Sequence, residues 1–278
     1  MSDRVIIVDK KSGQTPLDCV NQVKNEHPEW KHLPMTYAGR LDPLASGILL
    51  ILVGDECLKK DEYLALPKEY EVTVLFGFAT DTYDVLGKIT KTLVDASSAE
   101  VFERSSDLLA QDSLNERGQT ISNTSADSAS IQTAIKKFVG RIKQAYPPYS
   151  SRTVDGKPLF QWAREDKLDE ITIPAHDVFV ESIDIIDSNY ISGNELYSYV
   201  KNVISNVAGD FRQTEILGIW AEKLNEKTNS QYKTITLRIS CGSGVYVRSI
   251  VNELGVALGL PALALKIVRT KVGKYTLE

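Results

Sequence analysis

The sequence predicts an α+β fold on three observations. Residues 70–76 and 233–240 alternate between apolar and polar side chains, which is typical of half-buried β-strands. Apolar side chains recur at helical spacing in three other segments. Because the two patterns alternate without a regular strand–helix–strand rhythm, a mixed α+β architecture is favoured over a parallel α/β sheet.

Each predicted strand follows from its own pattern. In residues 233–240, the side chains of Ile235, Leu237 and Ile239 should share the core face, with polar side chains on the other face. Residues 47–54 form the longest apolar run and have glycine at both ends. That run is far too short to cross a bilayer, and it predicts a buried strand.

The helices follow from the 3.6-residue period and from capping residues. Ser130 is the expected N-cap of the first helix. Ser192 and Glu195 have the spacing of a capping box before the second, and Gly209 is expected to stop it. The apolar positions of the three helices fall within residues 131–142, 196–207 and 247–258.

We expect one domain over residues 1–278, with two additions to its core. Residues 105–130 are rich in Ser, Thr, Asn, Asp and Gln, so they should form a mobile loop that buries little apolar surface. Residues 187–232 contain the second helical pattern, and we expect a helical insertion between two strands.

The composition narrows the class of protein. With 278 residues, 42% of them apolar, the chain can bury a substantial core. The three cysteines lie far apart and the N-terminus has no signal-peptide pattern, so we expect a cytoplasmic protein without disulfides, zinc or a membrane anchor. The net charge of −5, taken as an average, argues against a nucleic-acid partner.

The densest cluster of special residues is the segment Ala38-Gly-Arg-Leu-Asp-Pro-Leu-Ala-Ser-Gly47. Pro43 excludes helical geometry at Asp42, and the flanking glycines allow a tight backbone path. An aspartate on a rigid turn before a buried strand is well placed to act on a substrate. The alternative is a turn aspartate that accepts hydrogen bonds from its own backbone.

This segment resembles the catalytic motif of the pseudouridine synthases, in particular the TruB family. One such motif alone would be a weak signal. Other segments resemble further landmarks of that family, in the same order along the chain, and together they span nearly all of it outside the two additions. These segments are residues 6–15, 68–72, 76–87, 149–164, 241–250 and 264–275.

The resemblance implies a pseudouridine synthase fold, with a mixed, mainly antiparallel sheet flanked by helices and loops. It also implies isomerisation of uridine to pseudouridine in RNA, in this family usually at position 55 in the T-loop of tRNA. The reaction needs no redox change and no external group, so we expect no cofactor. We expect a single copy of the chain to bind the T-arm.

The resemblance also assigns candidate roles. Asp42 is implied as the catalytic carboxylate, acting as nucleophile or base because an aspartate is normally ionised at neutral pH. Arg248 is implied to pair with it, although a surface arginine on a helix is the alternative. Tyr70 is implied to stack on the flipped base, and an ordinary cross-strand tyrosine is the alternative there.

Further residues are expected around the substrate. Tyr246 and Leu265 match an aromatic and an apolar pocket residue, or else belong to the core. Arg269 is assigned either to a phosphate contact or to the framework. Arg152 and Lys157 are candidate RNA contacts.

Two stretches are strongly basic despite the acidic total. Residues 136–168 carry eight Lys or Arg against three Asp or Glu, and residues 233–278 carry seven against two. Charge acts over about 10 Å at physiological salt, so a local basic surface can bind phosphates whatever the total. These stretches mark where we expect RNA to lie.

The chain departs from the family pattern at three places. Tyr37 stands where the family usually has a histidine that holds the flipped loop open. Arg40 is more usual in the ribosomal-RNA synthases. The chain stops at Glu278, just past the last landmark, so we expect the family's small C-terminal RNA-binding domain to be absent.

Two alternative functions follow. Arg40 favours the same chemistry on ribosomal RNA, and the scaffold could instead serve as a non-catalytic chaperone that binds tRNA. The chaperone hypothesis leaves the carboxylate of Asp42 unexplained, since an RNA groove gains nothing electrostatically from it. The paired carboxylates in residues 80–84 are better explained by turn chemistry than by a metal site.

Overall fold

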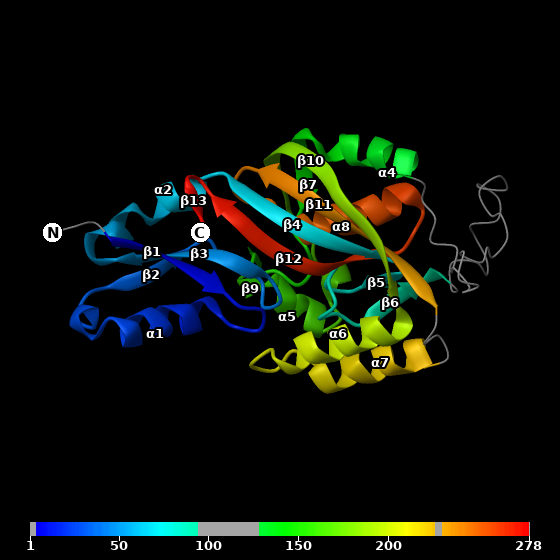
Figure 1. Cartoon of the computed structure of the whole chain (residues 1–278), viewed down its shortest axis with the longest axis horizontal. Coiled ribbons are helices and arrows are strands. Elements are labelled where there is room, and N and C mark those ends of the chain that lie inside the picture. Colours follow the sequence, from blue (N-terminus) through cyan, green and yellow to red (C-terminus); the bar gives the residue numbers. More distant parts are fainter. Residues whose placement is uncertain (1–3, 94–127, 226–229, 278) are drawn as a thin grey trace.

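A nine-stranded sheet runs through the molecule in the computed structural model, which describes residues 4–93, 128–225 and 230–277 (Figure 1). Its order is β1-β3-β12-β4-β11-β10-β7, with β2 beside β3 and β13 beside β12. Every pairing is antiparallel except that of β12 with β3, so the predicted α+β class is confirmed. The strands of this sheet are β1 (Arg4–Lys10), β2 (Met35–Ala38), β3 (Ser46–Val53), β4 (Lys68–Phe76), β7 (Gly140–Ala145), β10 (Ala175–Ser192), β11 (Gln231–Cys241), β12 (Ala262–Val272) and β13 (Tyr275–Thr276).

Two short hairpins and seven helices complete the described regular structure, apart from brief 3₁₀ turns. The hairpins pair β5 (Phe78–Thr80) with β6 (Ile89–Thr92), and β8 (Thr153–Val154) with β9 (Lys157–Pro158). The helices are α1 (Pro16–Glu26), α2 (Lys60–Ala65), α4 (Ser128–Ile135), α5 (Leu159–Arg164), α6 (Gly193–Ser205), α7 (Gln213–Asn225) and α8 (Val247–Leu258), of which α2 and α5 have only six residues each.

Helices cover both faces of the sheet because its central strands are apolar on both sides. Val74 and Phe76 of β4 pack with α4 and α8, whereas Leu75, between them in sequence, packs with α6 and α7. Alternating side chains of a strand point to opposite faces, so one strand contributes to two cores. Around β4 the sheet is therefore buried between a layer formed by α4 and α8 and a layer formed by α6 and α7.

The predicted strands are confirmed, with one refinement. β4 and β11 contain residues 70–76 and 233–240, and Ile235, Leu237 and Ile239 are buried as expected. Lys233 and Thr234 are buried as well, because α6 and α7 cover the second face at the start of β11. Half-burial holds only for the later part of the strand.

The helix predicted over residues 131–142 is wrong at both ends. Ser130 lies inside α4 rather than at its N-cap, and the helical conformation ends at Phe138. Gly140 has φ +98° and opens β7, which takes Ile142 into the sheet beside β10. A left-handed glycine stops a helix, and pairing with a neighbouring strand then overrides the apolar spacing.

The other two predicted helices are confirmed. α8 spans residues 247–258 as expected. α6 begins with the predicted capping box, in which the Ser192 hydroxyl accepts from the Glu195 N–H and the Glu195 carboxylate accepts from Ser192. It ends at Ser205, four residues before Gly209.

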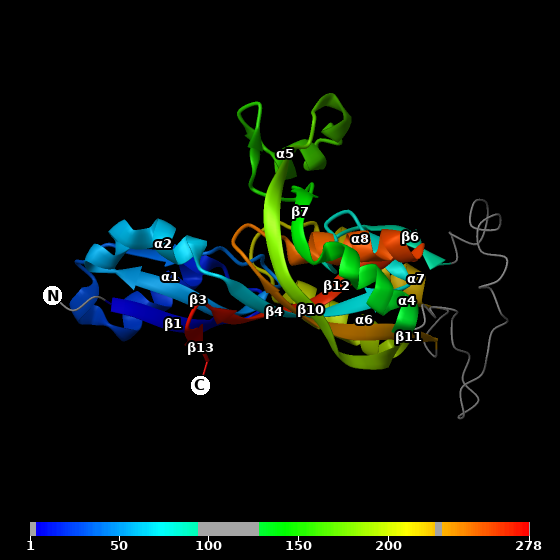
Figure 2. The same cartoon turned by 90° about the horizontal axis from the view of Figure 1, so that it is seen from above.

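The helical insertion consists of α6 and α7, which follow β10 and precede β11 in the sequence and pack against each other (Figure 1). Residues 187–192 belong to β10 instead, so the insertion starts later than expected. Most of the Ser-rich segment 105–130 lies outside the described residues. Residues 146–174, between β7 and β10, project from the body of the molecule with α5 (Figure 2).

Within the described parts of the chain, none of the helices combines the length and the apolar character needed to cross a bilayer.

Two glycines inside helices differ in packing, which allows a matched test of the fold. A Cβ atom at Gly255 in α8 would lie 2.6 Å from the Leu260 carbonyl oxygen, whereas one at Gly218 in α7 would meet nothing within 4 Å. We expect Gly255→Ala to lower the free energy of unfolding by about 1–3 kcal/mol through crowding. Gly218→Ala should raise it by up to about 1 kcal/mol, because alanine loses less backbone entropy. Urea unfolding measures both changes, and stabilisation by both substitutions would contradict the packing at the end of α8.

Candidate active site

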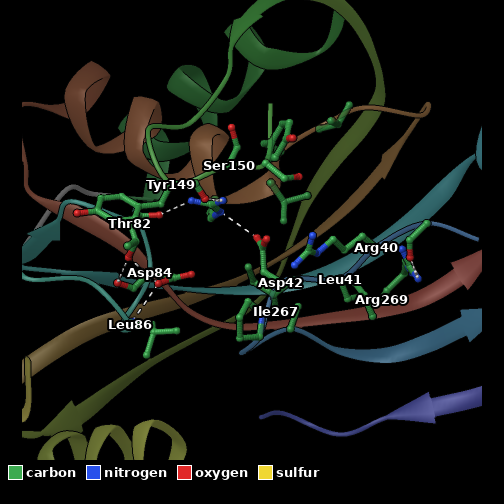
Figure 3. A pocket seen from close by; sticks show the side chains of 18 of the residues that line it. Arg40, Leu41, Asp42, Thr82, Asp84, Leu86, Tyr149, Ser150, Ile267 and Arg269 are labelled. Atoms are coloured by element: carbon green, nitrogen blue, oxygen red, sulfur yellow. Dashed lines mark hydrogen bonds and ion pairs between the residues drawn. The ribbon is translucent and has the colours of Figure 1, made fainter. Parts of the chain in front are cut away.

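Asp42 lies in the turn between β2 and β3, at the edge of a cavity of about 530 Å³ (Figure 3). The turn is held in place by Lys10 of β1, whose side chain is fully buried. The Lys10 ammonium group donates to the carbonyl oxygens of Asp42, Pro43 and Ala45 at 2.6–3.3 Å. Burial lowers the pKa of Lys10 to about 8. The backbone that carries Asp42 is thus fixed to the first strand.

Arg248, in the first turn of α8, pairs with Asp42. Its Nε donates to Oδ2 of Asp42 at 2.9 Å, Nη1 to the Thr82 carbonyl at 2.7 Å, and Nη2 to the Tyr149 carbonyl at 2.9 Å. The Arg248 side chain is 3% exposed and that of Asp42 is 36% exposed. The pairing that the resemblance implies is therefore present, and the surface alternative for Arg248 is excluded by its burial.

The electrostatics of this pair follow from its surroundings. Burial alone would lower the pKa of Arg248, but the carboxylates of Asp42 and Asp84 raise it above its ordinary value. The guanidinium group therefore stays charged in a site from which most water is removed. This permanent buried cation holds Oδ2 of Asp42 at 2.9 Å and so orients that carboxylate.

Asp84 is the second carboxylate near Arg248, and it is buried. Its Oδ1 accepts from the Thr82 hydroxyl at 2.7 Å and from the Leu86 N–H at 2.9 Å, so it shapes its own turn as the sequence suggests (Figure 3). Burial raises the pKa of Asp84 to about 6, against the opposing attraction of Arg248. Among residues 4–93, 128–225 and 230–277, no group of three His, Cys, Asp or Glu side chains is arranged to hold a metal.

Aromatic side chains form part of the cavity wall. Tyr70 of β4 and Tyr246, which precedes α8, both line it, and burial raises the pKa of each phenol. Both rings are therefore neutral at physiological pH and suited to contact with a planar base. The fully buried Gln144 fixes the backbone of Tyr246 by donating to its carbonyl at 3.1 Å and accepting from its N–H at 2.8 Å.

Arg269 of β12 makes the contacts of a framework residue, one of the two roles left open for it, and it also lines the cavity. Its side chain is 1% exposed, and it donates to the carbonyl oxygens of Ile48 at 2.7 Å and Gly39 at 2.9 Å. A Cβ atom at Gly47, where φ is +98°, would come within 2.3 Å of the Arg269 carbonyl oxygen. The glycine thus permits β3 and β12 to approach closely beside the turn of Asp42.

The remaining predicted site residues are only partly brought together. Arg40 is exposed and lines the cavity, but Leu265 lies at a register shift in β12 and packs with α6 and α7. Ile267 lines the cavity in its place. Tyr37 packs against the core of the first three strands and α1, with the Lys60 ammonium 5.5 Å from its ring centre.

The two basic candidates of the projecting segment also lie outside the cavity lining. The Arg152 guanidinium lies 5.1 Å from the ring centre of Tyr146. Lys157 pairs with Glu165 at 2.7 Å and covers the ring of Trp162 at 3.5 Å. Their roles as RNA contacts stay predictions.

Sequence reasoning missed the contribution of the helical insertion. Asp210, Phe211 and Arg212, which connect α6 to α7, line the cavity. The only local signal is their position directly after Gly209, the predicted stop of α6. Nothing in the sequence indicates that this connection reaches the turn of residues 80–84.

Comparison with known families now identifies the class of protein that this fold and site define. The family model described as "TruB family pseudouridylate synthase (N terminal domain)" matches residues 31–110 and 106–192, which together are more than half of the chain. The protein belongs to the TruB family.

Individual relatives match nearly the whole chain. A "tRNA pseudouridine synthase B" of Bifidobacterium longum is 29% identical, over 98% of this chain and 64% of its own length. One of Lactobacillus delbrueckii is also 29% identical, over 100% of this chain and 71% of its own length. The chain thus spans somewhat less than two thirds of the Bifidobacterium protein.

A solved structure shares the fold. A chain of the structure described as "Crystal Structure of a Cbf5-Nop10-Gar1 Complex" superposes with a TM-score of 0.50 over 99% of this chain and 50% of its own, at 16% identity. At that identity the likeness concerns the fold alone.

Asp84 makes stability depend on pH between about 4 and 6. Its carboxyl binds a proton near pH 6 in the folded chain and near pH 4 in the unfolded chain. Protonation therefore favours folding, and this stabilisation is lost as the pH rises through 6. Asp84→Asn keeps both accepted hydrogen bonds but does not titrate. Relative to this variant, the free energy of unfolding of the wild type should fall by about 1–3 kcal/mol from pH 4 to pH 7. Urea unfolding at both pH values measures this, and a difference that does not change with pH would refute it.

Proposed function

We propose that this protein isomerises uridine to pseudouridine in tRNA, at position 55 of the T-loop, with Asp42 as the catalytic carboxylate. The ion pair of Asp42 with the buried Arg248, at the edge of a cavity walled by Tyr70 and Tyr246, is the observation that carries the proposal. The names of the relatives, tRNA pseudouridine synthase B, support tRNA as the substrate.

The site supplies what the isomerisation requires. The bond between N1 of uracil and C1′ of ribose breaks, the base rotates, and a bond forms between C5 and C1′. C5 loses its proton and N1 gains one, so the product is an isomer of the substrate. No atom enters from outside and no electron is transferred to another molecule. The reaction therefore needs positioning and a carboxylate, and these are the properties of the described cavity.

Each side chain has a role in this scheme. Arg248 binds Oδ2 of Asp42, so Oδ1 is the oxygen that faces the substrate. A uridine within a loop reaches Oδ1 only when it is flipped out of its stack, and a neutral tyrosine ring such as that of Tyr70 can then stack on it. The cavity volume lies within the range of about 300–1,000 Å³ usual for small-ligand sites.

Substitution of Asp42 tests the chemistry. Asp42→Asn should lower pseudouridine formation on an unmodified tRNA transcript by at least about 1,000-fold, because asparagine neither attacks nor accepts a proton. The exposed Asp55, replaced by Asn, is the matched control and should leave the rate unchanged. Chemical mapping of pseudouridine gives the rate. No product from the wild type, or full activity in Asp42→Ala, would refute the proposal.

Binding by the same variants separates catalysis from a chaperone function. Asp42→Asn should bind tRNA with an affinity close to that of the wild type, because the substitution removes no contact to phosphates. If tRNA refolding is unchanged in a variant that forms no pseudouridine, both functions reside on one scaffold.

A comparison of the modification rates of two RNAs tests which RNA is the substrate. We expect the isolated T-arm hairpin to be modified at position 55, because the cavity accepts one flipped nucleotide and the flanking basic segment 136–168 accepts phosphates. A ribosomal-RNA fragment of equal length is the control, since Arg40 at the cavity favours that alternative. Single-turnover rates on the two RNAs measure the preference, and faster modification of the ribosomal fragment would assign the protein to that substrate instead.

A further inference from the structure

Among the residues of the helical insertion that line the candidate active site, Arg212 makes the most extensive side-chain contacts across it. The residue lies in the connection between α6 and α7 and lines the cavity. Its Nη1 donates to Oδ2 of Asp81 at 2.7 Å and to the Tyr149 hydroxyl oxygen at 2.8 Å, and Nη2 donates to Oδ1 of Asp81 at 3.3 Å. The guanidinium carbon also lies 4.5 Å from the ring centre of Tyr149. Arg212 therefore joins two segments that are far apart in sequence.

Those two segments are the ones that hold Arg248. The carbonyl of Thr82, next to Asp81, accepts from Nη1 of Arg248, and the carbonyl of Tyr149 accepts from Nη2. Arg248 in turn donates to Asp42 through Nε. A displacement of either segment would move an acceptor of Arg248 and with it the orientation of the ion pair. Arg212 thus contacts the residues that hold Arg248, and not the Asp42–Arg248 pair itself.

The contact of Arg212 is stronger than an ordinary surface ion pair. The side chains of Arg212 and Asp81 are 17% and 22% exposed, and the arginine binds both oxygens of the carboxylate. Two-pronged, partly buried pairs of this kind hold their geometry better than exposed pairs. Burial raises the pKa of Tyr149 to about 12, so its hydroxyl group stays neutral.

The backbone of the connection is held in an unusual conformation. Arg212 has φ +62°, a left-handed value that costs a non-glycine residue stability unless its surroundings enforce it. The Gln213 side chain ties the loop by donating to the carbonyl oxygens of Val207 and Gly209 and accepting from the Phe211 N–H. The loop is built to present the arginine side chain in one direction.

A second contact joins the insertion to the turn of Asp42 from the other side. A Cβ atom at Gly13 would lie 2.4 Å from the carbonyl oxygen of Asn206, which caps α6, so the end of that helix packs tightly on the turn after β1. The Gly13 N–H donates to the Pro43 carbonyl at 2.9 Å. The insertion therefore supports both Asp42 and its partner.

From these contacts we infer that Arg212 is a positioning residue, through which the α6–α7 insertion fixes the orientation of the Asp42–Arg248 pair. The inference builds on the proposed isomerase function, because the pair is the one to which that function is assigned. Arg212 itself touches no reacting atom in this scheme.

Arg212→Met tests the inference, with Lys201→Met as the matched control. Lys201 is an exposed cation on α6, in the same insertion. At saturating tRNA, Arg212→Met should lower the single-turnover rate by about 10- to 100-fold, because small misplacements of catalytic groups are costly. Its Kd for tRNA should stay within threefold of the wild type, and Lys201→Met should change neither value. A normal rate with a weaker Kd would mean that Arg212 binds RNA, and this would overturn the inference.

Graded variants guard against simple misfolding. Tyr149→Phe removes one acceptor of Arg212 and leaves the peptide carbonyl that Arg248 uses, so the rate should fall less, in the same direction. Arg212→Lys keeps the charge without the fork and should recover part of the rate. In the double variant Arg212→Met/Tyr149→Phe, the effects should not add, because both substitutions break one contact. If the two effects on the rate add fully, Arg212 and Tyr149 do not act through one shared contact, and the inferred positioning role is contradicted.

An activity-free readout distinguishes this inference from the proposed function. In protein with ¹⁵N-labelled arginine, the Nε–H signal of Arg248 is the one lost in Arg248→Lys and shifted in Asp42→Asn. Arg212→Met should shift or broaden that signal, and Lys201→Met should leave it in place. We expect this shift even if the wild type modifies no RNA. A wild type without activity would refute the proposed function but not the positioning role of Arg212. An unchanged signal in a folded Arg212→Met protein would overturn the positioning role.

Discussion

The need to satisfy one buried guanidinium group organises the centre of this protein. Arg248 is almost fully removed from water, and an arginine in that position must find acceptors for its donors. It finds them on the turn of Asp42, on the Thr82 segment and at Tyr149. Three stretches separated by long distances in sequence are brought together around one charge. The cavity is the space that remains beside that charge.

The sheet provides the rigid base for this arrangement. The antiparallel strands β4, β11 and β12 are packed by helices on both faces, so their ends are fixed in position. Tyr70 and Arg269 extend from two of these strands, and α8 follows the third with Arg248 in its first turn. Functional groups on regular elements are held more accurately than groups on free loops. The connection between α6 and α7 adds a support that the sheet itself does not provide.

Local patterns in the sequence predicted the elements whose structure is decided locally. The capping box at Ser192 and the apolar face of α8 are examples, because a few neighbouring residues determine each. The end of α4 was mispredicted because the apolar spacing of Ile142 fits either a helix or β7, and only pairing with β10 decides between them. The direction of the Leu265 side chain depends on a register shift in β12. The contact of Arg212 with Asp81 joins residues that are 131 positions apart in the sequence. No local pattern encodes such contacts.

The turn that carries Asp42 is held by both ends of the chain. Lys10, in the first strand, binds its carbonyl oxygens, and Arg269, in the last long strand, binds the backbone on either side of it. The turn therefore cannot open as an independent unit, since its release requires the outer strands to separate. We therefore expect the amide groups of this turn to exchange with solvent hydrogen more slowly than those of a flexible loop. A carboxylate placed there needs no reorganisation before it reacts, and a fragment that lacks either end of the fold would lose it.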